Sequence, residues 1–315
     1  KLDLSGDYWN ENRNKITRLP AGIEELNNLR DLDLSWNLID TLPAEIGKLK
    51  NLKKLNLSGI KLKVLPAEIS ELTNLTTLDL SSNDLSTLPN EIGQMEKLTD
   101  LNLSGIQFND LPAELGKLKN IIRLNLSKIK TSVLPSEIGQ LKNLTFLDLS
   151  NVHLTTLPSE IGQLEELTHL TLNYNDLTIL PVEIGELKNL TSLSVYSNKL
   201  TTLPPEVGQL KNLTYLGVSE NKLTTLPPEI GQLKNLKELS LQTNQLNALP
   251  DQIGELGNLT YLNLSMNKLT SLPAGIINLK KFFAFKFVGL VAFEKRLFVD
   301  FRSEEHTSEL QSRQC

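Results

Sequence analysis

Residues able to do chemistry are few in this sequence of 315 residues. The histidines are His153, His169 and His306, and the one cysteine is Cys315. Neither a clustered set of metal ligands nor a cysteine nucleophile with a nearby base is indicated. The sequence contains no P-loop, no GxSxG nucleophile elbow and no zinc-binding HExxH motif. It therefore predicts no catalytic residues, no metal site and no cofactor, and a protein that is not an enzyme.

Aromatic side chains are the more informative group. Phe146, His169, Tyr174, Tyr196 and Tyr215 occupy places that similar stretches of the chain mostly fill with Ser, Thr, Asn or Asp. Tyrosine combines a large apolar area with a hydroxyl group, and aromatic residues are enriched in the energetic centres of protein interfaces. These five residues are the predicted partner-binding site. The alternative is that isolated surface aromatics on an extended fold have no function.

A 23-residue repeat must position these side chains. Its first apolar residue recurs at Leu29, Leu52, Leu75, Leu98, Ile121, Leu144, Leu167, Leu190, Leu213, Leu236 and Leu259. Eleven complete units fill residues 29–281, and a truncated unit precedes them in residues 1–28. A fixed period of this length predicts a solenoid in which each unit packs against its neighbours.

The unit that begins at Leu190 shows what the positions do. Leu190, Leu193 and Val195 alternate with polar residues, which predicts a short strand with one buried face. Pro204 and Gly208 bracket a predicted helical turn, with proline near its start and glycine past its end. Strands are expected at Leu32 and every 23 residues thereafter.

The pattern LxxLxLxxNxLxxLPxEIGxLxN resembles the leucine-rich repeat family, in its 23-residue form that includes Ras-group-related and leptospiral repeats. The resemblance implies an α/β solenoid. This would be a right-handed horseshoe with a parallel concave β-sheet and short helical or 3-10 turns on the convex side. It also implies that the asparagine of the pattern, Asn198 in the unit above, points inward and bonds the free backbone of neighbouring turns.

Four units have lost this asparagine and carry Ile60, Ile106, Ile129 or Val152 instead. Apolar side chains fill the space but cannot bond the backbone, so water or altered loop geometry must satisfy those groups. Thr131 also replaces a core leucine nearby. The middle third is therefore expected to be the most irregular part of the solenoid. Neutral drift within the core is the alternative to a functional hinge.

The two ends depart from the repeat. Residues 282–301 hold seven of the nine phenylalanines and read as a C-terminal cap or, alternatively, a frameshifted segment. Residues 302–315 include RSEEHTSELQS, which resembles a translated sequencing-library adapter, so this tail is expected to be non-native. The chain lacks an initiator methionine, and its true N-terminus is expected to be missing. Tyr8, Trp9 and Trp36 are read as a cap on the first end or as a secondary partner-binding patch.

Charge and composition limit the classes of partner that the chain is expected to bind. Lys and Arg total 32 against 37 Asp and Glu, for a net charge of −5, and no basic tract occurs, so nucleic acid is not expected. The apolar C-terminal run is too short to span a membrane. The predicted function is an interaction module or scaffold that binds a protein on its concave face. The alternative is the recognition arm of a larger enzyme or receptor, such as an effector ligase or a kinase.

Carbohydrate is a second class of ligand, less favoured than protein. The sequence allows no disulfide, and Asn56, Asn102, Asn125 and Asn263 are potential glycosylation sites on the predicted concave sheet. Both observations favour a cytoplasmic location over a bacterial surface or a secreted one, without deciding between them.

Overall fold

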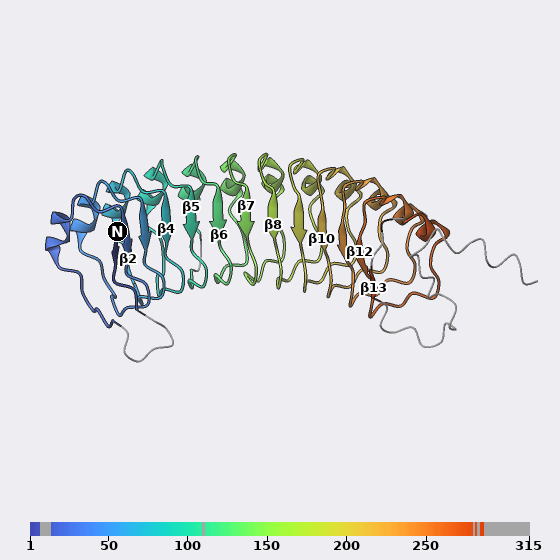
Figure 1. The fold of residues 1–315 in the computed structure, drawn as a ribbon, viewed down its shortest axis with the longest axis horizontal. Helices are drawn as coiled ribbons and strands as arrows, with labels where there is room; N and C mark the ends of the chain where they lie inside the picture. Colours follow the sequence, from blue (N-terminus) through green and yellow to red (C-terminus); the bar gives the residue numbers. More distant parts are fainter. Residues whose placement is uncertain (7–13, 109–110, 280, 282–283, 287–315) are drawn as a thin grey trace, which may run out of the picture.

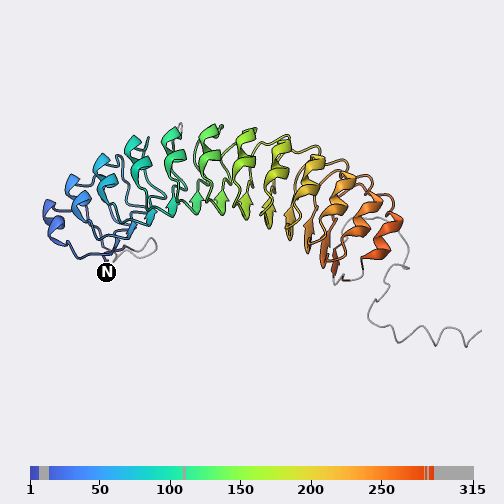
Figure 2. The ribbon, with the colours of Figure 1, turned by 90° about the horizontal axis from the view of Figure 1, so that it is seen from above.

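The computed structural model describes residues 1–6, 14–108, 111–279, 281 and 284–286, which form one curved solenoid. Figure 2 shows the strands along the inner, concave side of the arc and the helical turns along the outer side. The predicted right-handed α/β solenoid is confirmed. Tyr8, Trp9 and the tail 302–315 lie outside the described residues, and the division of the chain into repeats, cap and tail stays a prediction.

In the described part of the chain, the concave sheet has thirteen parallel strands, ordered as in the sequence. Each strand pairs residue for residue with the next, as in Leu32 with Leu55. The strands therefore recur every 23 residues, as the leucine column predicts. They are β1 (Leu2–Asp3), β2 (Asp31–Asp33), β3 (Lys54–Asn56), β4 (Thr77–Asp79), β5 (Asp100–Asn102), β6 (Arg123–Asn125), β7 (Phe146–Asp148), β8 (His169–Thr171), β9 (Ser192–Ser194), β10 (Tyr215–Gly217), β11 (Glu238–Ser240), β12 (Tyr261–Asn263) and β13 (Ala284–Lys286).

The convex side is built from 3-10 turns of five residues. They are η1 (Ala21–Glu25), η2 (Ala44–Lys48), η3 (Ala67–Glu71), η4 (Asn90–Gln94), η5 (Ala113–Lys117), η6 (Ser136–Gln140), η7 (Ser159–Gln163), η8 (Val182–Glu186), η9 (Pro205–Gln209), η10 (Pro228–Gln232), η11 (Asp251–Glu255) and η12 (Ala274–Asn278). A proline directly precedes each turn, with φ −67° at Pro204, and its carbonyl accepts the first hydrogen bond of the turn. Proline's fixed φ suits the start of a helical turn.

The predicted place of the glycine was wrong. Gly208 lies inside η9, as its fourth residue, and not past its end. A Cβ at Gly208 would lie 2.5 Å from the backbone oxygen of Glu229 in the next unit. The glycine therefore permits close approach of neighbouring convex turns, and its role is packing between units rather than ending the helix.

The core is one continuous stack of apolar columns. Leu193, at the centre of β9, is fully buried, and its counterparts in the other complete units are equally enclosed. Phe108 and Thr131 both occupy the column of Leu200 and are also buried. The threonine hydroxyl donates to the carbonyl of Val133 at 3.0 Å, which satisfies its polar group.

The asparagine column behaves as the resemblance implies where it is intact. Asn198 is buried and its Oδ1 accepts a hydrogen bond from the backbone N–H of Leu177 at 3.1 Å. Its Nδ2 donates to the carbonyls of Leu172 at 2.9 Å and Val195 at 3.2 Å. One amide side chain thus ties the loops of two neighbouring units together.

Where the asparagine is missing, the loops change. Ile60, Ile106, Ile129 and Val152 are all buried. An asparagine at these four positions would accept a hydrogen bond from the N–H of Ile39, Leu85, Phe108 or Thr131. Within the described residues, these four N–H groups make no hydrogen bond. Lys61 (φ 68°) and His153 (φ 64°), which follow Ile60 and Val152, adopt the left-handed conformation. The strands keep their register across this region, so the irregularity is confined to the loops.

A backbone ladder shows the extent of that change. In five successive units the residue after the asparagine donates its N–H to the unit before: Asp176 to Leu154, Lys199 to Leu177, Lys222 to Leu200, Gln245 to Leu223 and Lys268 to Leu246, at 2.8–2.9 Å. Among the described residues, the equivalent N–H groups of the preceding five units make no such bond: Lys61, Asp84, Gln107, Lys130 and His153. We call residues 52–166 the first block and residues 167–281 the second block.

Candidate partner-binding surface

The parallel register places the third residues of successive units side by side on the concave face. Phe146 on β7 is paired with Arg123 on β6 and with His169 on β8. The Arg123 guanidinium carbon lies 4.4 Å from the centre of the Phe146 ring, and Arg123 Nε lies 3.7 Å from Asp100 Oδ1. The rings of Phe146 and His169 are 6.4 Å apart and tilted by 36°. Arg123, Phe146 and His169 therefore form one cluster, although Arg123 was not among the predicted site residues.

Tyr174 and Tyr196 form a second cluster on the loop edge, the row of loops that follow the strands. Their ring centres are 4.9 Å apart and the rings are nearly perpendicular, at 87°. The Tyr174 hydroxyl donates to the Tyr196 hydroxyl at 3.4 Å, which in turn donates to Glu220 Oε1 at 2.9 Å. These hydrogen bonds, first that with Tyr174 and then that with Glu220, raise the pKa of Tyr196 far above its ordinary value.

Tyr215 leans along β10 over Gly217. A Cβ at Gly217 would lie 2.6 Å from the Tyr215 hydroxyl and 3.0 Å from two ring carbons. The other complete units carry Asp, Asn, Ser or Thr where Gly217 stands. The missing side chain therefore makes the room in which the Tyr215 ring lies along the sheet.

The five predicted residues thus form two touching pairs and one separate ring. Ser192 lies between His169 and Tyr215 in the register of the sheet. Trp36 lies far along the solenoid, in the first complete unit, where its indole packs against the backbone of Gly59. Trp36 is therefore not part of the same surface as the five predicted residues.

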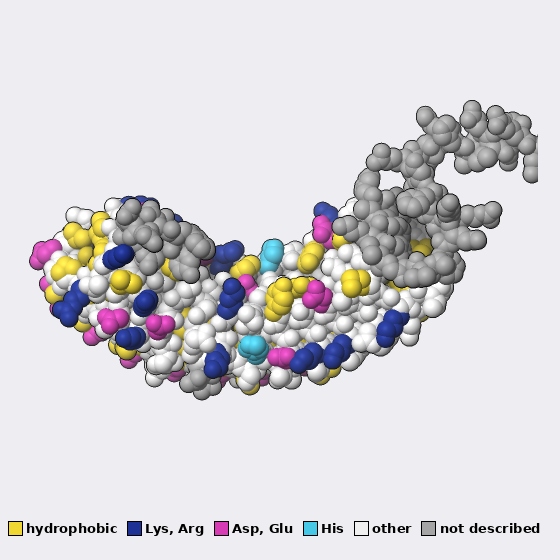
Figure 3. Space-filling model, turned by 90° about the horizontal axis from the view of Figure 1, so that it is seen from below, with side chains coloured by type: hydrophobic (Ala, Val, Ile, Leu, Met, Phe, Trp, Pro, Cys, Tyr) yellow, Lys and Arg dark blue, Asp and Glu magenta, His cyan; other side chains and the backbone are white. Residues whose placement is uncertain are grey.

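Charge is sparse on the middle of the concave face. Strands β8, β9 and β10 contain no Asp, Glu, Lys or Arg, and His169 is their one ionisable basic side chain. Figure 3 is viewed onto the loop edge, where hydrophobic side chains lie close to an acidic one in the central part of the molecule. The surface is thus aromatic and hydroxyl-rich, bordered by isolated charges.

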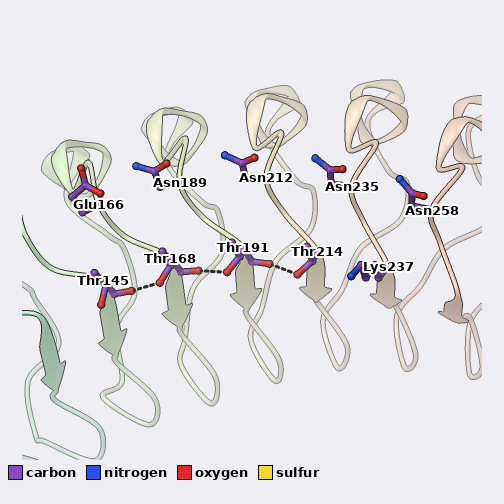
Figure 4. Close-up of a pocket in the computed structure, with 10 residues that line it drawn as sticks. All are labelled: Thr145, Glu166, Thr168, Asn189, Thr191, Asn212, Thr214, Asn235, Lys237 and Asn258. Carbon is purple, nitrogen blue, oxygen red and sulfur yellow. Dashed lines mark hydrogen bonds between the residues drawn. The ribbon is translucent and has the colours of Figure 1, made fainter.

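An open groove runs along the opposite edge of the sheet, where strands β7–β12 begin (Figure 4). It is lined by Thr145, Glu166, Thr168, Asn189, Thr191, Asn212, Thr214, Asn235, Lys237 and Asn258. The Thr191 hydroxyl donates to the Thr168 carbonyl at 3.0 Å, and Asn212 Nδ2 donates to the Lys188 carbonyl at 2.9 Å. These donors hold neighbouring units together, and we assign the groove a structural role.

Within the described part of the chain, no three His, Cys, Asp or Glu side chains gather as metal ligands. The same residues include no helix long and apolar enough to cross a bilayer.

An open stack of parallel three-residue strands, 3-10 turns and buried asparagines defines a class of solenoid proteins. The chain belongs to the leucine-rich repeat family: the model of the leucine-rich repeat region matches residues 2–127, 166–248 and 205–295, and a second leucine-rich repeat model matches residues 143–164.

Solved structures agree. The chain is 41% identical to a leucine-rich repeat protein of Leptospira interrogans, covering 91% of this chain and 77% of that one, with a TM-score of 0.82. It is 30% identical to the plant peptide hormone receptor RGFR1, solved in complex with RGF2, covering 91% of this chain and 50% of that one, with a TM-score of 0.64. An internalin of Listeria monocytogenes, 22% identical over 91% of this chain and 86% of that one, has a TM-score of 0.74 and shows the fold alone. A comparison with curated proteins gave no match.

Proposed function

We propose that this chain is an interaction module that binds a protein partner on its concave face and the adjoining loop edge. The observation that carries the proposal is the placement of Phe146, His169 and Tyr215 on strands β7–β10 and of Tyr174 and Tyr196 on the adjoining loop edge. The stack does not need aromatic side chains at these places, because other units carry residues as different as serine, lysine and glutamate there. Large rings supply contact area at a low cost in side-chain entropy, and strands β8–β10 contain no Asp, Glu, Lys or Arg.

The relatives support a binding role in general terms. RGFR1 is a plant peptide hormone receptor solved in complex with RGF2, and this chain covers half of it. Because RGFR1 is about twice as long as the matched part, the coverage also supports the alternative function, in which the solenoid is the recognition arm of a larger receptor or enzyme. The two functions share the same surface and differ in what is attached to it.

The test uses peptides selected on the intact chain from a random display library. Affinity is then measured by calorimetry for the wild type, Tyr196→Ala, Tyr215→Ala and the convex control Glu160→Ala. Each tyrosine variant is expected to lose about 1–4 kcal/mol of binding free energy, as truncations in interface centres do. Glu160→Ala should change the affinity little. Binding that survives both tyrosine changes and disappears with Glu160→Ala would place the site on the other side.

Gly217→Ser gives a sharper version of the same test. The serine Cβ would occupy the space of the Tyr215 hydroxyl, so the ring must move while its chemistry is kept. We expect weaker peptide binding with little loss of stability, because the displaced atoms are the far end of a side chain. Unchanged affinity would mean that the placement of Tyr215 over Gly217 is not used.

A further inference from the structure

The loop edge carries a corner of two perpendicular rings and one carboxylate. Tyr174 and Tyr196 supply the rings and Glu220 the carboxylate, on three consecutive units. Within the described residues, the Glu220 carboxylate accepts a hydrogen bond from Tyr196 and lies within 4.0 Å of no lysine, arginine or histidine nitrogen. Lys199, on the neighbouring unit, is already paired with Asp176 at 2.7 Å.

This combination is suited to a cation. The faces of aromatic rings attract ammonium and guanidinium groups, and a carboxylate beside them adds a full negative charge. A neutral apolar ligand would leave Glu220 without a charged partner. A negatively charged ligand would be repelled by it.

The backbone holds the corner in place. Tyr174 N–H donates to the Tyr196 carbonyl at 2.9 Å, and Glu220 N–H donates to the Gln242 carbonyl at 2.9 Å. Tyr174 (φ 56°) and Glu220 (φ 53°) are both in the left-handed conformation, which occurs at the same place in every complete unit. The loops here belong to the second block, where the asparagine column and the backbone ladder are continuous.

We propose that Tyr174, Tyr196 and Glu220 form a binding site for a lysine or arginine side chain of the protein partner. The proposal rests on the proposed function and adds a charge requirement to it. The neutral sheet of β8–β10 would contact the body of the partner, and the corner would select partners that present a basic residue at its edge.

The test needs no partner. The chain contains five tyrosines, so ring-labelled tyrosine gives a simple NMR spectrum, in which Tyr174→Phe and Tyr196→Phe assign the two signals of the corner. The probes are Nα-acetyl-lysine amide and its uncharged analogue Nα-acetyl-norleucine amide, titrated at constant ionic strength. We expect saturable shifts of the Tyr174 and Tyr196 signals with the lysine probe and none with the norleucine probe. Glu220→Gln should weaken lysine binding about 2- to 5-fold, whereas Glu160→Gln on the convex side should leave it unchanged.

Three results would overturn the proposal: no shift with the lysine probe, equal shifts with norleucine, or unchanged lysine binding by Glu220→Gln. The outcome separates the two proposals. If the corner fails this test while selected peptides still depend on Tyr215, only the cation site is lost. If the corner binds lysine while no selected peptide depends on the tyrosines, the proposed function is lost.

Discussion

The two five-unit blocks share one core and differ in their loops. In both, the strands keep the same length and register and the leucine columns are buried. In residues 167–281 every unit has its asparagine and the backbone ladder is continuous, whereas in residues 52–166 four of five units lack the asparagine. The apolar stack alone therefore suffices for the fold, and the polar ladder adds order to the loop edge.

This difference bears on the candidate site. Tyr174, Tyr196 and Glu220 lie on loops of the second block, where side-chain amides and backbone bonds fix the geometry. Preorganised groups lose less conformational entropy when a partner binds. The loop edge of the second block is thus better suited to recognition than that of the first block, and four predictions can break or sharpen this comparison.

The largest loss of stability should come from truncating a core leucine, and it should be similar in the two blocks. Leu124 and Leu193 are fully buried at the same position of their units. Leu124→Ala and Leu193→Ala should each lower the free energy of unfolding by about 2–5 kcal/mol, because each leaves a cavity between stacked turns. Urea denaturation measures both. A much smaller loss for Leu124→Ala would mean that the blocks differ in their cores and not only in their loops.

The asparagine column should have the next largest effect. Asn198→Ala is expected to cost about 1–3 kcal/mol of stability, because it leaves the N–H of Leu177 and the carbonyl of Leu172 without this partner. The reciprocal change Val152→Asn in the first block should shift stability by less than about 1 kcal/mol, since recovered hydrogen bonds offset lost apolar burial. Thermal unfolding of the two variants checks this. Equal losses for both would contradict the role of the column.

Hydrogen exchange should report the ladder directly. The N–H groups of Lys199 and Lys222 are bonded to the unit before, whereas those of Lys61 and Lys130 are not. We expect the bonded pair to exchange roughly tenfold more slowly, after correction for local sequence, because exchange requires the bond to open. Residue-resolved exchange by NMR measures the ratio. Similar rates in both blocks would mean that the ladder does not stiffen the loop edge.

Much of the fold could be predicted from the sequence, because the period fixes the register and the register fixes the neighbours. The strand positions follow from the 23-residue spacing, and the inward-pointing Asn198 was implied by the family resemblance. The contact of Tyr174 with Tyr196 was not predicted, since the two residues are not 23 positions apart and stand in different columns of the repeat. The left-handed residue before each position of the asparagine column was not predicted, because residues such as Trp36, Lys128 and Tyr174, and not only glycine, stand there. Nor was the contact of Arg123 with Phe146, although the register had placed them on adjacent strands.

The candidate site could therefore be predicted only in part from the sequence. The residue types identified the surface, but the pose of each side chain depends on what its neighbour leaves free. Gly217 made room for Tyr215, and Glu220 completed the pair of rings one unit beyond Tyr196. Gly217 stands in a column that the other complete units fill with Asp, Asn, Ser or Thr, so a departure beside an aromatic residue identifies it in the sequence. The column of Glu220 varies from unit to unit and gives no such signal.

The smallest predicted effect is a difference in stability between a glycine and an alanine variant, which should have opposite signs at Tyr174 and at Tyr215. Tyr174 has φ 56°, where a side chain costs about 1–2 kcal/mol relative to glycine. Tyr174→Gly should therefore be more stable than Tyr174→Ala by about 1 kcal/mol, although both lose the ring. Tyr215 lies in strand β10, where glycine is the worse choice, so Tyr215→Gly should be less stable than Tyr215→Ala by about 0.5–1 kcal/mol. Thermal unfolding of the four variants measures the two differences. The same order at both sites would show that the loop edge does not impose the left-handed conformation, and with it the geometry proposed for the corner.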